Sequence, residues 1–170
     1  FNILFSHFEM LRFPNSAIGT IMYPALSKEK SEQKQRDYIK SKIWFNLLIY
    51  PPILVVAYFL YPKLVLLMYG PEYEILTKYF KYILLAGTPY LIAYPVVHYF
   101  SSNGAPQYEG LVIFISLSIQ LVSVLLFNYI VNFTLFNAVI SQSIGFIGFT
   151  IGLFILYNSI SLAPKQIEKV

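Results

Sequence analysis

The chain has 170 residues, of which 57% are hydrophobic and 12% are charged, with a net charge of +4 and no cysteine. Soluble domains carry about 25% charged residues, so this composition and the clustering of its charges exclude an ordinary soluble domain. The lack of cysteine excludes disulfide frameworks, thiolate metal sites and thiol nucleophiles. In a membrane chain, a small positive charge concentrated in one loop and the tail reports topology, so we expect no nucleic-acid partner.

Long runs without any charged residue indicate the fold class, and the longest of them extends from Gly110 to Pro164. A membrane span needs about 20 apolar residues, whereas one helix of this length would reach roughly 80 Å, so the run must turn back once near residues 128–137. Closed β-barrels have alternating strands of about 10 residues and a polar interior. These runs are apolar on all sides, so the sequence predicts an all-α, polytopic bundle of transmembrane helices.

The runs and their interruptions predict about five helices in one membrane domain that covers residues 1–170. Adjacent prolines at 51 and 52 should kink the second helix, and Pro89 and Pro95 are candidate breaks in the third. Because the chain opens at Phe1, inside the first predicted helix, we interpret it as a fragment of a longer protein. The predicted helices are 1–27, 43–60, 74–100, 107–131 and 135–160.

The distribution of basic residues predicts the orientation of these helices, since Lys and Arg are enriched on the cytoplasmic side. The hydrophilic loop 28–42 and the tail 163–170 fall on one side and are richest in Lys and Arg, so we expect both to be cytoplasmic. Segments 61–73 and 128–134 are then outside, and the protein is a multi-pass protein of the cytoplasmic membrane. The basic residues of the opposite side are Lys63, Lys78 and Lys81.

The first predicted helix carries an unusual polar stripe, because polar residues recur along it at steps of three or four and so share one face. Arg12 follows Glu9 by three residues at the border of this face. One interpretation is a structural Glu9–Arg12 pair; the other is a wall of a hydrated substrate cavity, in which the Arg12 fork binds a phosphate. The stripe includes Asn2, and the candidate cavity residues are Arg12, Glu9, Ser6, Ser16 and Thr20.

Other chemistry-bearing patterns are few. His98 lies deep in the third predicted helix, where it is either a neutral imidazole bonded to a neighbouring helix or a proton relay. The sequence has no Walker loop, no Gly-x-Ser-x-Gly, no His-Glu-x-x-His and no carboxylate pair. We therefore expect no enzymatic activity, no cofactor and no metal site.

Small and amide side chains predict how the helices pack. Asn46 and Gln120 should form hydrogen bonds between helices, since isolated amides in apolar spans seek a partner. The last predicted helix has a Gly-x-x-x-Gly motif on a face of small residues, which lets another backbone approach closely. This face consists of Ser141, Gly145, Gly148 and Gly152.

Four short motifs in order resemble a known family. Tyr-Pro-Ala-Leu-Ser-Lys (23–28) ends one helix, Pro51 and Pro52 fall within the next, Met-Tyr-Gly-Pro-Glu-Tyr (68–73) follows it, and Asn-Gly-Ala-Pro (103–106) forms a later loop. Their order and spacing over residues 16–160 resemble the polysaccharide and O-antigen flippases of the multidrug/oligosaccharidyl-lipid/polysaccharide (MOP) exporter superfamily.

The resemblance implies a transporter with a dozen or more helices in two lobes around a central cavity. Such proteins flip a lipid-linked oligosaccharide from the inner to the outer leaflet by alternating access. The chain would be most of the C-terminal lobe. Its expected partners are membrane lipid, a lipid-diphosphate-linked sugar and the missing N-terminal lobe of the same protein.

Other functions remain open at this point. A cation-coupled multidrug exporter of the same superfamily should place acids, rather than an arginine, in its cavity. A membrane-embedded cell-wall glycosyl transferase or ligase needs ionisable residues clustered on one face and long extracytoplasmic loops. A purely structural membrane subunit is a further alternative.

Overall fold

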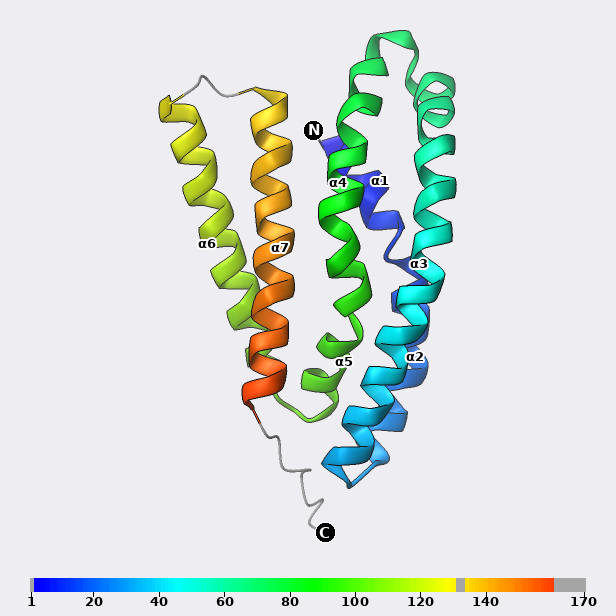
Figure 1. Cartoon of the computed structure of the whole chain (residues 1–170), viewed down its shortest axis with the longest axis vertical. Coiled ribbons are helices and arrows are strands. Elements are labelled where there is room, and N and C mark those ends of the chain that lie inside the picture. The colour runs from blue at the N-terminus through cyan, green and yellow to red at the C-terminus, as the bar shows by residue number, and fades with distance from the viewer. Residues whose placement is uncertain (1, 131–133, 161–170) are drawn as a thin grey trace.

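The computed structural model describes residues 2–130 and 134–160, and every regular element within them is a helix (Figure 1). This confirms the predicted all-α bundle. The elements are α1 (Asn2–Met10), α2 (Phe13–Lys28), α3 (Glu32–Tyr69), the short 3₁₀ helix η1 (Pro71–Tyr73), α4 (Glu74–Ala93), α5 (Pro95–Ser102), α6 (Gln107–Ile130) and α7 (Leu135–Ser159).

Four helical segments are long and apolar enough to cross a membrane: α3, the stretch Pro71–Ser102, α6 and α7. Large apolar side chains also cover much of the outer surface, as at Leu67, Leu85 and Phe114, which are 84%, 74% and 70% exposed. Such a surface suits lipid rather than water. The chain is therefore a helical membrane protein with transmembrane helices.

The prediction of one continuous helix over 1–27 is wrong, because the structure breaks it at Leu11 and Arg12 into α1 and α2. Pro14 explains the break: it lacks an N–H, and its ring would collide with the carbonyl of Met10 in a continuous helix. Proline is accepted in the first turn of a new helix, which is where α2 places it. Neither α1 nor α2 alone is among the four segments that could span.

The segment 28–42, predicted as a hydrophilic loop that is helical in part, is mostly helical, since α3 begins at Glu32. Ser31 caps this end, as its hydroxyl accepts a hydrogen bond from the backbone N–H of Lys34. At its other end α3 runs past the predicted residue 60 to Tyr69. It stops at Gly70, whose φ of 90° is a conformation that favours glycine. The first turns of α3, residues 32–42, thus extend its apolar span as a hydrophilic helix.

The third predicted helix, 74–100, is divided at Tyr94 into α4 and α5, at one of its two candidate breaks. Pro95 has no N–H, so the carbonyl of Leu91 lacks its helical donor. The side-chain amides of Asn15 and Asn46 supply donors instead, at 2.7 and 3.2 Å. Pro89, the other candidate, stays within α4.

The helices alternate in direction along the bundle (Figure 1). The α2–α3 connection, the α5–α6 connection and the end of α7 lie at one end, and the α3–α4 connection lies at the other. This is the alternation that the sequence predicts, whereas the assignment of one end to the cytoplasm remains a prediction. The tail 163–170 lies outside the described residues.

The last two helices match their predicted bounds to one residue, and their contact uses the small-residue face of α7. A Cβ added to Gly145 would lie 3.0 Å from Oε1 of Gln120, and one added to Gly152 would lie 3.0 Å from Cγ1 of Val112. Both neighbours belong to α6. The predicted close approach of this face to another helix is confirmed.

Candidate functional site

Arg12 occupies the corner between α1 and α2, where the helix break turns its side chain toward α4. Its Nη1 donates to Oε2 of Glu9 at 2.6 Å, and its Nη2 donates to the hydroxyl of Tyr94 at 2.7 Å. The guanidinium carbon also lies 4.9 Å from the centre of the Tyr94 ring and 5.6 Å from that of Tyr90. A carboxylate, a phenol and two aromatic faces therefore compensate one cation.

A cavity of about 260 Å³ lies beside this cation, between α1, α4, α6 and α7. Its walls mix aromatic and apolar side chains, such as Phe146 and Phe149, with polar groups. Gln120 of α6 donates to Gln142 of α7 at 2.7 Å across one wall, which confirms the predicted interhelical bond of Gln120. The polar and charged lining residues are Glu9, Arg12, Tyr90, Tyr94, Glu109, Ser116, Gln120 and Gln142.

The charges of the cavity are unequal, because two carboxylates, Glu9 and Glu109, face one guanidinium. The side chains of Arg12 and Glu9 remain 31% and 29% exposed, so the ion pair is open to a ligand in the cavity. The Nε of Arg12 is buried and has no hydrogen-bond partner within the described residues. The guanidinium fork has the geometry that suits phosphate, while Glu9 occupies one of its donors and Glu109 adds a second carboxylate to the cavity.

The structure brings together only part of the predicted stripe. Glu9 and Arg12 line the cavity, whereas Ser6, Ser16 and Thr20 are exposed and lie outside its lining. The hydroxyl of Thr20 donates to the carbonyl of Ala17 in its own helix, at 2.7 Å. The break before α2 shifts the helical phase, so residues on either side of it no longer share one face. The side chain of Asn2 lies outside the described residues.

His98, predicted as a relay or a neutral interhelical imidazole, is not part of the cavity lining. Its ring lies against Gly19 of α2, and a Cβ at that glycine would overlap the imidazole. It also contacts the ring of Tyr94 edge-on, with 5.4 Å between centres. The Nε2 is buried without a hydrogen-bond partner in the described part of the chain, and His98 forms no ion pair there. These contacts favour the neutral, packed imidazole over the proton relay.

Several cavity residues were missed by sequence reasoning. Tyr90 lies in α4 and Tyr94 directly follows its last residue, four positions on, so the two share a face, and this i, i+4 spacing was the signal available. Glu109, treated only as the border of a charge-free run, enters the cavity from the first turn of α6. Gln142 is an isolated amide in an apolar helix, as Gln120 is. Isolated amides in apolar spans seek a hydrogen-bond partner, so the same reasoning that singled out Gln120 could have singled out Gln142.

Within residues 2–130 and 134–160 there is no group of three or more His, Cys, Asp or Glu side chains that could hold a metal ion. A comparison of the chain with protein-family models, curated proteins and solved structures found no match. The fold and the site together define a helical membrane protein with a polar cavity between its helices.

Proposed function

We propose that the chain is part of a transporter that flips a lipid-linked oligosaccharide across the cytoplasmic membrane by alternating access. The observation that carries the proposal is the accessible Arg12 guanidinium in a polar cavity between the helices of the bundle. The four ordered motifs that resemble the MOP flippases support the same function. In this proposal the chain is a multi-pass component of one lobe, and a second lobe completes the cavity.

The chemistry of such a substrate suits the cavity. A diphosphate offers oxygens in the geometry that an arginine fork binds through two hydrogen bonds. The amides of Gln120 and Gln142 and the phenol of Tyr94 offer donors and acceptors for sugar hydroxyls. The apolar exterior lets an isoprenoid tail remain in lipid during transport. Glu9 then acts as an exchangeable counter-ion, which holds Arg12 until the diphosphate arrives.

The proposal is tested by reconstituting the complete protein in vesicles with a fluorescent isoprenoid-diphosphate sugar and measuring its flipping. Arg12→Ala should lower the rate by more than about tenfold, since a charged hydrogen bond contributes about 1.5–3 kcal/mol. Arg12→Lys should be intermediate, because it keeps the charge and loses the fork. Ser118→Ala, an exposed position on α6, is the control. Normal flipping by well-folded Arg12→Ala protein would contradict the proposal.

A second function, cation-coupled export of a drug-like substrate, is favoured by one observation: Glu9 and Glu109 both line the cavity. Carboxylates in a membrane cavity are the usual sites for a coupling cation. Glu109→Gln separates the two functions. It should abolish gradient-driven transport of a cationic drug in an exporter, whereas in the flippase it should leave Arg12-dependent flipping within a few fold of wild type.

A further inference from the structure

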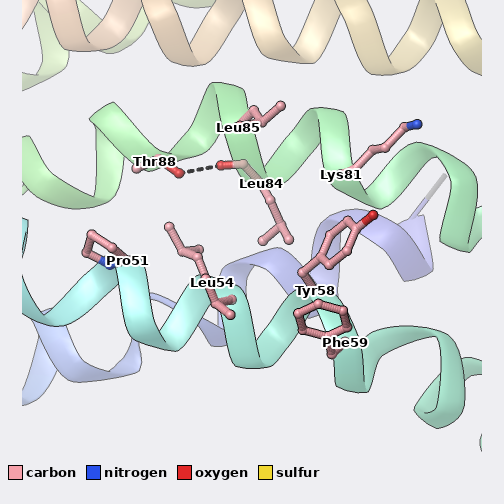
Figure 2. A pocket seen from close by; sticks show the side chains of 9 residues that line it. Pro51, Leu54, Tyr58, Phe59, Lys81, Leu84, Leu85 and Thr88 are labelled. Carbon is pink, nitrogen blue, oxygen red and sulfur yellow. Dashed lines mark hydrogen bonds between the residues drawn. The ribbon is translucent and has the colours of Figure 1, made fainter.

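A second cavity, distinct from that around Arg12, lies between α3 and α4. It has a volume of about 490 Å³ and a lining that is almost wholly apolar. Figure 2 shows Leu54 of α3 and Leu84 of α4 on its two walls, with Pro51 and Thr88 toward one end. Volumes of roughly 300–1,000 Å³ are typical of sites that hold small ligands.

The sequence of α3 explains why these two helices leave a groove. Pro51 and Pro52 lie within α3 and remove backbone donors, which bends a helix. In Figure 1, α3 changes direction near its middle. The groove runs from Pro51 to Phe59 on α3, which is about 12 Å along the axis at 1.5 Å per residue. It is therefore a narrow apolar channel parallel to two membrane-crossing helices.

The groove ends in a basic, polar mouth. A neighbouring cavity of about 270 Å³ shares Tyr58, Phe59 and Lys81 with it and adds Lys78 and Thr77. In Figure 2 the ammonium of Lys81 points away from Leu84, toward the end of α4 nearest η1, and the hydroxyl of Tyr58 lies at the same end of the groove. This is the pattern of a lysine that keeps its stem on apolar surface and its charge near the headgroups.

The ammonium groups of the two lysines have little compensation: that of Lys81 lies 5.1 Å from the centre of the Tyr82 ring, a cation–π contact. Neither Lys78 nor Lys81 forms an ion pair within the part of the chain that the structure describes. Lys81 is seven positions beyond the first residue of α4, about 10 Å along the axis from the start of that helix. A negatively charged group at the mouth would therefore meet two ammonium groups that have no acidic partner among the described residues, close to one membrane surface.

We propose that this groove binds an anionic phospholipid of the surrounding bilayer, with one acyl chain between α3 and α4 and the phosphate at Lys78 and Lys81. The apolar channel matches the chain, and the basic mouth matches the charge of the headgroup. A zwitterionic lipid fills the channel equally well and also offers a phosphate, but it brings a quaternary ammonium close to the two lysines, so the site favours a headgroup with a net negative charge. This site is separate from the proposed transport cavity and does not depend on it.

The headgroup contact is tested by native mass spectrometry of the complete protein extracted from vesicles of equal phosphatidylglycerol and phosphatidylcholine. Wild type should retain phosphatidylglycerol in preference to phosphatidylcholine. Lys78→Gln with Lys81→Gln should lower the retained phosphatidylglycerol by about tenfold or more, since each basic residue near the surface strengthens binding of anionic lipid about fivefold. Lys63→Gln is the matched control, because Lys63 is exposed on α3 and lines neither cavity.

The acyl-chain contact is tested by filling the channel. Val55 lines it and is 56% exposed, whereas the adjacent Val56 is 55% exposed and does not line it. Val55→Trp should reduce the retained lipid by about fivefold or more, and Val56→Trp should leave it unchanged. The two positions are matched in exposure, and the folded fraction of each variant is checked by size-exclusion chromatography before lipid retention is compared.

Several results would overturn the proposal. Equal retention of both phospholipids, or unchanged retention in the double lysine variant, removes the headgroup contact. Equal effects of the two tryptophan variants remove the channel. Displacement of phosphatidylglycerol by equimolar isoprenoid diphosphate would assign the groove to a transport substrate instead. The two proposals can fail separately. Arg12→Ala should lower the flipping rate and leave lipid retention unchanged, because Arg12 does not line the groove.

Discussion

The side-chain amide of Asn15 in α2 donates to the carbonyl of Leu91 in α4 at 2.7 Å, where Pro95 leaves that carbonyl without its helical donor. Asn46 of α3 donates to the same carbonyl and also to Oδ1 of Asn15, at 3.2 and 2.8 Å. Both asparagines are 1% exposed. The carbonyl that Pro95 leaves free thus links α2, α3 and α4 through hydrogen bonds. This link lies next to Tyr94, whose hydroxyl accepts a hydrogen bond from Arg12.

Asn15→Ala should destabilise the protein by about 1–3 kcal/mol, because it leaves a buried carbonyl with one donor fewer. The effect should appear as a lower midpoint of thermal unfolding in detergent. Combined with Asn46→Ala, the loss should be non-additive, since both amides serve one carbonyl. Asn158→Ala is the matched control, as Asn158 is exposed and its amide donates to the carbonyl of Phe154 in its own helix. Equal unfolding midpoints for Asn15→Ala and the control would argue against this bond network.

Arg36 caps the C-terminal end of α7 from α3. Its Nη1 and Nη2 donate to the carbonyls of Tyr157 and Ile160 at 2.8 and 2.6 Å, and its Nε donates to Glu32 at 2.8 Å. A cation at this position satisfies carbonyls that lack helical donors and complements the helix dipole.

Arg36→Met should therefore fray the last turn of α7 and cost about 1–2 kcal/mol. Hydrogen exchange should show at least about fivefold faster exchange of the amides in that turn, and little change in α6. Lys34→Met, an exposed position on the same helix, should have no such effect. Unchanged exchange in the Arg36 variant would show that the cap is dispensable.

The small-residue face of α7 predicts a steric effect. Gly148→Leu should lower the folded yield, because the added side chain must enter the contact with α6 and separate the two backbones. Gly148→Ala should be tolerated, since its Cβ would lie 3.6 Å from Ile119, an ordinary contact. Gly110→Leu is the control, because nothing lies within 4 Å of a Cβ there. Yield is measured by fluorescence size-exclusion chromatography, and wild-type yield for Gly148→Leu would contradict the packing.

Much of the fold was predictable from the apolar runs, because a membrane span has a strict length and composition. The bounds of α6 and α7 illustrate this. Gln35 shows the limit: it lies in the hydrophilic segment 28–42 yet is 2% exposed, and its amide donates to the carbonyls of Leu26 and Glu29, each at 2.8 Å. That role depends on the end of α2 lying beside α3, which no local pattern encodes.

The candidate site was predictable only in its local part. Glu9 and Arg12 are three residues apart, and the ion pair that was one of their two interpretations is present. Tyr94 and Glu109 reach the same cavity from distant parts of the chain, so tertiary packing alone brings them there. Ser16 and Thr20 were misplaced because a break was not expected at Pro14. Ser6 precedes the break and is exposed outside the cavity as well.

The predicted orientation is tested by labelling single cysteines in intact cells with a membrane-impermeant thiol reagent. Lys34→Cys, exposed near the α2–α3 connection, should remain unlabelled, because basic segments stay in the cytoplasm. Glu72→Cys, exposed between α3 and α4, should react. Both should react once the cells are opened. Labelling of Lys34→Cys alone in intact cells would invert the topology.

If Arg12 exchanges Glu9 for an anionic substrate, the affinity of the reconstituted protein for an isoprenoid diphosphate measures this exchange most directly. Arg12→Gln should weaken binding by more than about tenfold, since it removes the charged donors. Glu9→Gln should strengthen binding several-fold, because it removes the competing carboxylate. Two results would contradict this exchange. One is a Glu9→Gln variant that binds as weakly as Arg12→Gln, and the other is an Arg12→Gln variant that binds as tightly as wild type.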